Sequence, residues 1–166
     1  VEIWDQNKKR LFEYPKVEYA CRSLNSLIKS IQFLRHKLPE INLKLIVLDD
    51  HSNSGNLEKI KKIAKQEKNS EIISLNYNNF KSVIKEQKSE QTFSNLASLL
   101  KSFEIGKEYG EDLIFFVEDD YLHFKTMLEE MVYSFQRISS QLNKDIFMCP
   151  SDYPYLYMDN EKTNIL

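Results

Sequence analysis

The stretch that decides the fold is Leu43-Lys44-Leu45-Ile46-Val47-Leu48-Asp49-Asp50. Its short apolar run is typical of a buried parallel strand, and the run stops at two carboxylates. A second stretch, Asp112-Leu113-Ile114-Phe115-Phe116-Val117-Glu118-Asp119-Asp120, has the same design and the strongest strand signal in the chain. Each predicted strand therefore carries acidic side chains at its carboxyl end.

Helical patterns surround these two strands. Apolar residues recur at three- and four-residue steps, which predicts helices over 17–38, 57–67, 92–108 and 124–142. Two shorter runs, 71–75 and 146–148, are predicted to be further strands, and the polar stretch 76–90 a long loop. Because helices and strands alternate along the chain, we expect an α/β fold with a mostly parallel sheet and helices on both faces.

The bulk composition fits one domain and excludes several classes of protein. The chain has 166 residues, 42% of them hydrophobic, which suits a single core. Its 23 basic and 25 acidic residues are interspersed and give a net charge of -2, so no nucleic-acid partner is predicted. Only three glycines occur, which excludes the glycine-rich phosphate loops of Walker or dinucleotide type.

The cysteines and the hydropathy pattern bear on the compartment. Cys21 and Cys149 are far apart and lack paired spacing, which argues against a disulfide scaffold and a zinc site. Two isolated thiols suit a reducing compartment, so a cytoplasmic location is predicted. No apolar run is long enough to span a bilayer, and no transmembrane segment is expected.

The acidic run Glu118-Asp119-Asp120 is a candidate metal site. Three adjacent carboxylates repel one another unless a cation or water offsets their charge. Mg²⁺ is held in proteins by one or two carboxylates together with substrate phosphates, and ligands of open α/β sheets bind outside the carboxyl ends of strands. The alternatives are a solvated turn at residues 118–120 and a capping role for Asp49 or Asp50.

Both acidic stretches resemble a known family. Ile46-Val47-Leu48-Asp49-Asp50-His51-Ser52 is similar to the strand-then-Asp-Asp-Gly-Ser segment of family 2-like glycosyltransferases with the GT-A fold. Phe115-Phe116-Val117-Glu118-Asp119-Asp120 resembles their Asp-x-Asp motif, in the Glu-Asp-Asp form of N-acetylglucosaminyltransferases. Asn95 and the helix containing Cys21–Leu27 also resemble family features, and the resemblance spans roughly residues 17–150.

The resemblance implies a GT-A, Rossmann-like domain that binds a nucleotide sugar. The implied activity is that of a hexosyltransferase, which moves a sugar from a UDP-linked donor to a hydroxyl of a glycan or other acceptor. Asp50, with Asp49 nearby, would contact the base. Glu118 and Asp119 would face the ribose and the water shell of a Mn²⁺ or Mg²⁺ ion. Asp120 would be the direct metal ligand beside the diphosphate.

Some positions depart from the family pattern. His51 stands where the family has glycine, and only Val1–Trp4 could represent the strand expected before helix 17–38. The catalytic base of inverting members lies further along than this chain extends. Asp152 is the candidate within reach, with a turn role beside Pro150 as the alternative. We therefore expect residues 1–166 to form one domain that is incomplete at both ends, with its catalytic base unassigned.

Two alternative functions fit parts of the same pattern. The segment Leu45–Ser52 also looks like the first strand and acidic pair of a phospho-receiver domain, with Asp119 or Asp120 as the phosphate acceptor. Receivers, however, begin near that strand, whereas here a whole helix precedes it. The other alternative is a GT-A-like domain that binds a sugar or nucleotide without catalysis.

Overall fold

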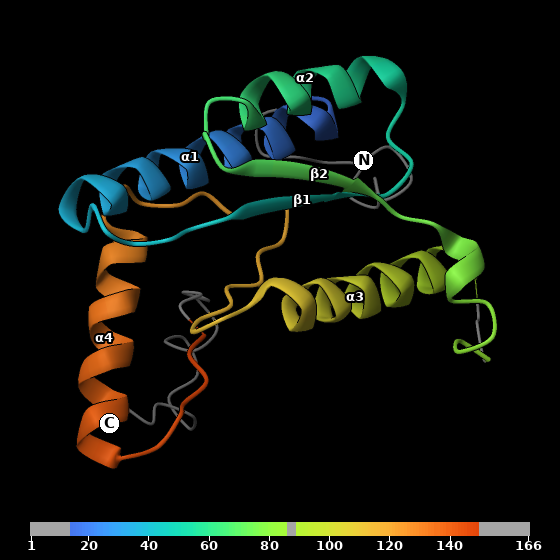
Figure 1. Ribbon diagram of the computed structural model, residues 1–166. Coiled ribbons are helices and arrows are strands. Elements are labelled where there is room, and N and C mark those ends of the chain that lie inside the picture. The colour runs from blue at the N-terminus through green and yellow to red at the C-terminus, as the bar shows by residue number, and fades with distance from the viewer. Residues whose placement is uncertain (1–13, 86–88, 150–166) are drawn as a thin grey trace, which may run out of the picture.

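The computed structural model describes residues 14–85 and 89–149. This part of the chain has an α/β fold with four α-helices, one 3-10 helix and two strands (Figure 1). The elements in chain order are α1 (Lys16–Lys37), β1 (Leu45–Asp49), α2 (Ser54–Ala64), β2 (Ser70–Ser74), η1 (Tyr77–Asn79), α3 (Glu90–Tyr109) and α4 (Met127–Leu142). None of these helices combines the length and apolar character that crossing a membrane requires.

Strands β1 and β2 form a parallel pair joined by α2. Leu45 lies opposite Ser70 and Asp49 opposite Ser74, and the Leu75 amide donates to the Asp49 carbonyl at 2.8 Å. Helices α1 and α2 lie on one face of the pair and α3 on the other (Figure 1). The predicted α/β class, the parallel pairing and the helices on both faces are therefore confirmed.

The core divides into two clusters because successive side chains of β1 point to opposite faces. Leu45 and Val47 pack toward α1, and Leu48 packs toward α3. The buried members of the first cluster are Leu27, Ile28, Ile31, Leu34, Leu45 and Leu128, and those of the second are Leu75, Phe80, Ile84, Phe93 and Ala97. The sheet is thus covered by apolar side chains on both faces.

Two serines of α1 allow the chain before α4 to approach closely. The His123 amide donates to Ser26 Oγ at 2.9 Å, and the Leu128 amide donates to Ser30 Oγ at 3.1 Å. Thr126, the residue that precedes α4, makes no side-chain capping bond of its own. Ser30 therefore satisfies one of the amides that a helix start leaves unpaired.

A buried ion pair joins α1 to the end of α2. Arg35 Nη2 lies 2.9 Å from Glu67 Oε1 and also donates to the Leu43 carbonyl. Glu67, which is 3% exposed, accepts the Asn69 amide as well, and Asn69 Nδ2 donates to the Leu43 carbonyl at 2.9 Å. These bonds fix the chain where it enters both strands.

The predicted strand over 112–117 is wrong for the described structure. Residues 113–118 form neither helix nor strand, because no neighbouring strand completes a backbone ladder with them. Of their apolar side chains, Phe115 packs against the first core cluster, and the others are more than a third exposed. The Phe103 and Phe116 rings meet edge to face at 5.1 Å, and Gly110 permits this return of the chain. A Cβ at Gly110 would lie 2.5 Å from the Gly106 carbonyl oxygen.

The predicted strand over 146–148 is also wrong. Helix α4 ends at Leu142, Asn143 adopts a left-handed conformation with φ of 49°, and Phe147 is fully exposed. The predicted loop 76–90 includes η1, whose flank buries Phe80 and Ile84. Local apolar runs alone therefore did not decide which segments become strands.

Removing Glu67 should destabilise the fold strongly. Glu67→Ala leaves the Arg35 guanidinium buried without its partner, and we expect a loss of about 3–5 kcal/mol in the free energy of unfolding, measured by urea denaturation. The double variant Arg35→Met/Glu67→Leu should recover most of that loss. Glu58→Ala, which breaks an exposed ion pair with Lys61, should leave the midpoint of urea denaturation unchanged. An equal loss in the Glu58 and Glu67 variants would contradict this role.

Candidate functional site

The Asp50 carboxylate is the centre of a polar cluster at the tip of β1. Tyr77 Oη donates to Asp50 Oδ1 at 2.6 Å, and Ser94 Oγ donates to Asp50 Oδ2. His51 Nδ1 lies 2.8 Å from Asp50 Oδ1. Three separate segments of the chain therefore meet on one carboxylate. One follows β1, one follows β2, and the third is the start of α3.

Capping residues nearby in the sequence position Tyr77 and Ser94. Tyr77 follows the Asn76 side chain, which accepts the Asn78 amide and starts the short helix η1. Ser89 caps α3 by accepting the Thr92 amide at 3.1 Å, which sets the helix start so that Ser94 falls on its buried face. Ser94 is 2% exposed, whereas the Asp50 side chain is 20% exposed. The cluster therefore reaches solvent through His51, whose side chain is 51% exposed, and in part through Asp50.

His51 occupies a backbone conformation that favours glycine. Its φ is 56°, a left-handed value that costs a non-glycine residue roughly 1–2 kcal/mol. The imidazole bonds Asp50, and its ring lies 4.4 Å from the Tyr77 ring. These contacts offset the strain. They are consistent with a histidine at a position where the resembling family has glycine.

Burial and hydrogen bonding act in opposite directions on the Asp50 carboxyl. Burial raises its pKa, but the bonds from Ser94, Tyr77 and His51 lower it by more, so the net pKa is below the usual value. For Tyr77, burial and the bond to Asp50 raise the pKa of the phenol. Asp50 is therefore an anion at neutral pH, and Tyr77 is its neutral donor.

Lone pairs limit what Asp50 can still bind. An ionised carboxylate offers about four acceptor positions, and three are taken by Tyr77, His51 and Ser94. One position on Oδ2 remains for a donor from outside. Asp49, which is buried, lies on the opposite face of the strand with Leu45 and Val47. The two carboxylates therefore do not form one site.

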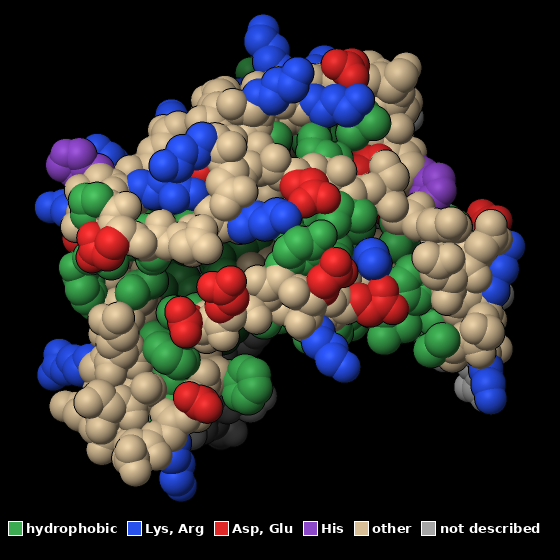
Figure 2. Space-filling model, viewed as in Figure 1, with side chains coloured by type: hydrophobic (Ala, Val, Ile, Leu, Met, Phe, Trp, Pro, Cys, Tyr) green, Lys and Arg blue, Asp and Glu red, His purple; other side chains and the backbone are tan. Residues whose placement is uncertain are grey.

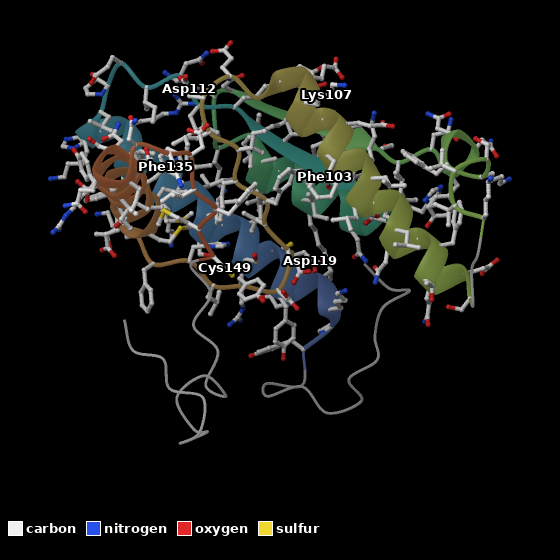
Figure 3. The ribbon with its side chains drawn as sticks, turned by 90° about the horizontal axis from the view of Figure 1, so that it is seen from below. Phe103, Lys107, Asp112, Asp119, Phe135 and Cys149 are labelled. Atoms are coloured by element: carbon white, nitrogen blue, oxygen red, sulfur yellow. The ribbon has the colours of Figure 1, made fainter. Side chains whose placement is uncertain are left out.

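The acidic run lies beside the first turn of α1. Glu118, Asp119 and Asp120 are exposed in a turn, and Asp119 Oδ2 lies 3.9 Å from Lys16 Nζ. Lys16 opens α1, whose first turn lies near the end of β1 because the helix and strand run in opposite directions (Figure 1). Figure 3 shows Asp119 beside that first turn and Asp112 far from it. Asp119 therefore lies beside α1, which covers one face of the strand pair, whereas Asp50 bonds to Ser94 of α3 on the other face.

The described residues contain no preformed set of metal ligands. Within 14–85 and 89–149, no three carboxylate, imidazole or thiol side chains converge as metal ligands. His123, which follows the acidic run closely in sequence, is half-buried against Phe115, and burial lowers its pKa. It is a packed residue.

Asn95 and Asp152, which were also named from the sequence, are not part of the Asp50 cluster as described. Asn95 is exposed on α3, one position away from the Ser94 that contacts Asp50. Asp152 lies outside the described residues. Sequence reasoning missed Tyr77 and Ser94, although a tyrosine shortly after a predicted strand and a serine in the first turns of a helix were available as signals.

Comparisons with known proteins identified no similar protein. No family model matches the chain, and neither the curated proteins nor the solved structures contain a match. Any function must therefore be argued from the site itself.

Replacing Asp50 should change how stability depends on pH. Because its pKa is lower in the folded chain than in the unfolded one, the ionised carboxyl stabilises the fold above about pH 4, and this contribution disappears as pH falls through the folded value. Asp50→Asn should cost about 1–3 kcal/mol at pH 7 by urea unfolding, with a gap to wild type that narrows as the pH falls below about 4. Asp112→Asn, which replaces an exposed carboxylate outside the cluster, is the matched control.

The strained backbone at His51 gives a second test. The free energy of unfolding of His51→Gly, measured by thermal denaturation, should exceed that of His51→Ala by about 1 kcal/mol, because glycine tolerates the left-handed conformation. At Ser52, where φ is not positive, the order of the glycine and alanine variants should reverse. Alanine above glycine at position 51 would mean that this backbone strain is absent.

Proposed function

We propose that this protein is a nucleotide-sugar-dependent glycosyltransferase of hexosyltransferase type, with a GT-A, Rossmann-like domain. The observation that carries the proposal is the Asp50 carboxylate at the tip of β1, fixed by three donors and left with one acceptor position. Ligands of open parallel sheets bind outside the carboxyl ends of strands, where this cluster lies. The resemblance of residues 46–52 and 115–120 to family motifs supports the same assignment.

In this proposal Asp50 recognises the base. Its remaining lone pair accepts an N–H such as the one that uracil presents, while Tyr77 and Ser94 hold the carboxylate in place. The paired rings of His51 and Tyr77 at the exposed rim offer a surface for stacking. Asp49 lies on the other face of the strand, so its part is to support the strand end.

The acidic run would contact the phosphates through a divalent ion. Mn²⁺ or Mg²⁺ requires one or two carboxylates when substrate phosphates complete its shell, and exposed Glu118, Asp119 and Asp120 meet that requirement. Such an ion neutralises the diphosphate as it leaves. Asp120 is assigned as the ligand, and Glu118 and Asp119 as partners of ribose and metal-bound water. Lys16, 3.9 Å from Asp119, adds a cation beside this run.

The alternatives are less well supported. A phospho-receiver needs an acidic pair beside the phosphate-accepting aspartate, and no group of three acidic side chains converges within the described residues. A non-catalytic domain that binds the same donor shares the site. It would retain UDP binding without transfer to a glycan or other hydroxyl acceptor.

Binding of UDP-N-acetylglucosamine with and without Mn²⁺ tests the proposal by calorimetry. We expect Mn²⁺ to raise the affinity of the wild-type chain by about ten-fold or more, because it offsets the charge of the diphosphate. Asp120→Ala should lose this increase while keeping metal-free binding, whereas Asp50→Asn should weaken both. Asp112→Ala, an exposed carboxylate at the far end of the same segment, is the matched control. Loss of the Mn²⁺ effect in the control, or no binding by wild type, would refute the assignment.

A further inference from the structure

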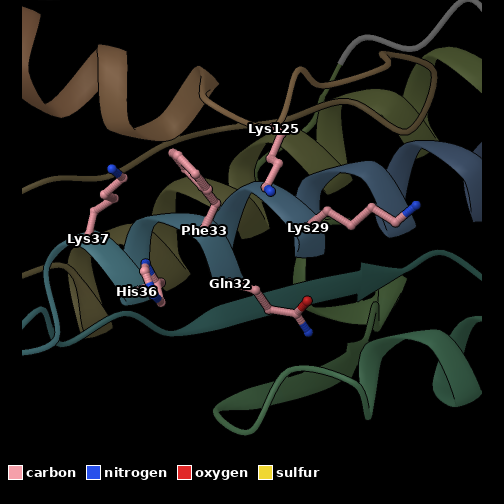
Figure 4. Close-up of a pocket in the computed structure, with 6 residues that line it drawn as sticks. All are labelled: Lys29, Gln32, Phe33, His36, Lys37 and Lys125. Carbon is pink, nitrogen blue, oxygen red and sulfur yellow. The ribbon is translucent and has the colours of Figure 1, made fainter.

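A second charged site lies on α1, away from Asp50. Lys29, Gln32, Phe33, His36 and Lys37 from the second half of α1, together with Lys125 from the chain before α4, line an open groove of about 610 Å³ (Figure 4). We call this the cationic groove. It lies toward the end of α1 that leads into β1, whereas Asp50 lies where β1 ends. The two sites are therefore separate.

The positive charge in the cationic groove is not neutralised by the protein. Within the described residues, Lys29, His36, Lys37 and Lys125 make no ion pair with a carboxylate, although other lysines of the chain do. The chain as a whole is slightly acidic, so this gathering is not a consequence of its composition. Clustered ammonium groups repel one another until an anion offsets them.

An aromatic ring holds two of these cations in place. Lys37 Nζ lies 5.5 Å and Lys125 Nζ 5.0 Å from the centroid of the Phe33 ring, both within the range of a cation–π contact. Figure 4 shows the ring between the two ammonium groups, with Lys29 further along the helix. Lysines held in this way lose less side-chain entropy when a ligand binds.

Helix electrostatics explain only part of the cluster. His36 and Lys37 lie in the last turn of α1, where cations complement the helix dipole. Lys29 lies about two turns earlier, and Lys125 comes from another segment. Neither gains from the end of α1, so the presence of Lys29 in the groove and the approach of Lys125 to the Phe33 ring need another reason.

We propose that the cationic groove binds a ligand with at least two phosphoryl groups. Lysine ammonium groups are compact charges suited to phosphate. Lys29 and Lys37 are eight residues apart, which sets them about 12 Å apart along the helix, further than one phosphate reaches. A linear polyphosphate chain and adjacent phospholipid headgroups present the same chemistry. This site does not rest on the proposed glycosyltransferase activity.

Two probes applied to the full chain test the groove and identify the source of phosphate. Sodium tripolyphosphate is titrated by calorimetry, and vesicles of phosphatidylcholine with phosphatidylglycerol are tested by co-sedimentation. Binding of tripolyphosphate supports a soluble ligand, and binding of vesicles alone supports headgroups. Lys37→Gln/Lys125→Gln should weaken the observed binding by about ten-fold or more, because charge-assisted contacts are lost.

A charge-matched control separates the groove from general attraction. Lys59→Gln/Lys62→Gln removes two exposed lysines from α2 and should change affinity by about two-fold or less. Phe33→Leu keeps every charge but removes the ring, and should weaken binding by about two- to five-fold. Equal losses in the two double variants, or no binding of either probe to wild type, would overturn the proposal.

Discussion

The buried pair of Arg35 and Glu67 is the interaction on which the arrangement of this fold depends. Two charges removed from water are better tolerated when their remaining donors and acceptors are satisfied, and here the Leu43 carbonyl accepts from Arg35 and the Asn69 amide donates to Glu67, while Arg35 Nε stays buried without a partner. The pair joins the end of α1, the chain entering β1 and the turn before β2. It thereby fixes where each strand begins, and so where the carboxyl end of β1 emerges.

The sequence patterns were sufficient for elements whose burial is local and periodic. Helix α1 and strands β1 and β2 were found within a few residues, because one helical face or one short run meets the core. The run 112–117 has an equally apolar composition, yet a strand exists only if a neighbour completes its ladder. That neighbour is set by topology, which a local pattern does not contain. Instead Phe116 packs on Phe103 of α3 and Phe115 packs against the first core cluster, while Leu113, Ile114 and Val117 are largely exposed. Figure 2 shows hydrophobic side chains at the surface around α3.

In the candidate site, too, the residue marked by a local sequence pattern was predicted, and the residues brought in from other elements were not. Asp50 was found from its place after an apolar run, a signal within one segment of the chain. Tyr77 and Ser94 come from other elements, and only the fold brings them to its carboxylate. The strained backbone of His51 was not foreseen, because a left-handed conformation leaves little trace in the sequence when the residue is not glycine.

Helix α3 is attached unevenly along its length. Phe93, Ser94 and Ala97 anchor its first turns in the second core cluster and at Asp50, Leu99 in its middle is about half exposed, and Ile105 and Gly106 are buried again near its end. Opening free energies follow local burial, so the exposed middle of this helix should exchange its amide hydrogens faster than the two buried stretches. A change in the Asp50 cluster acts on the start of α3, and the helix can pass that change on to Phe116, which packs on Phe103 near its other end.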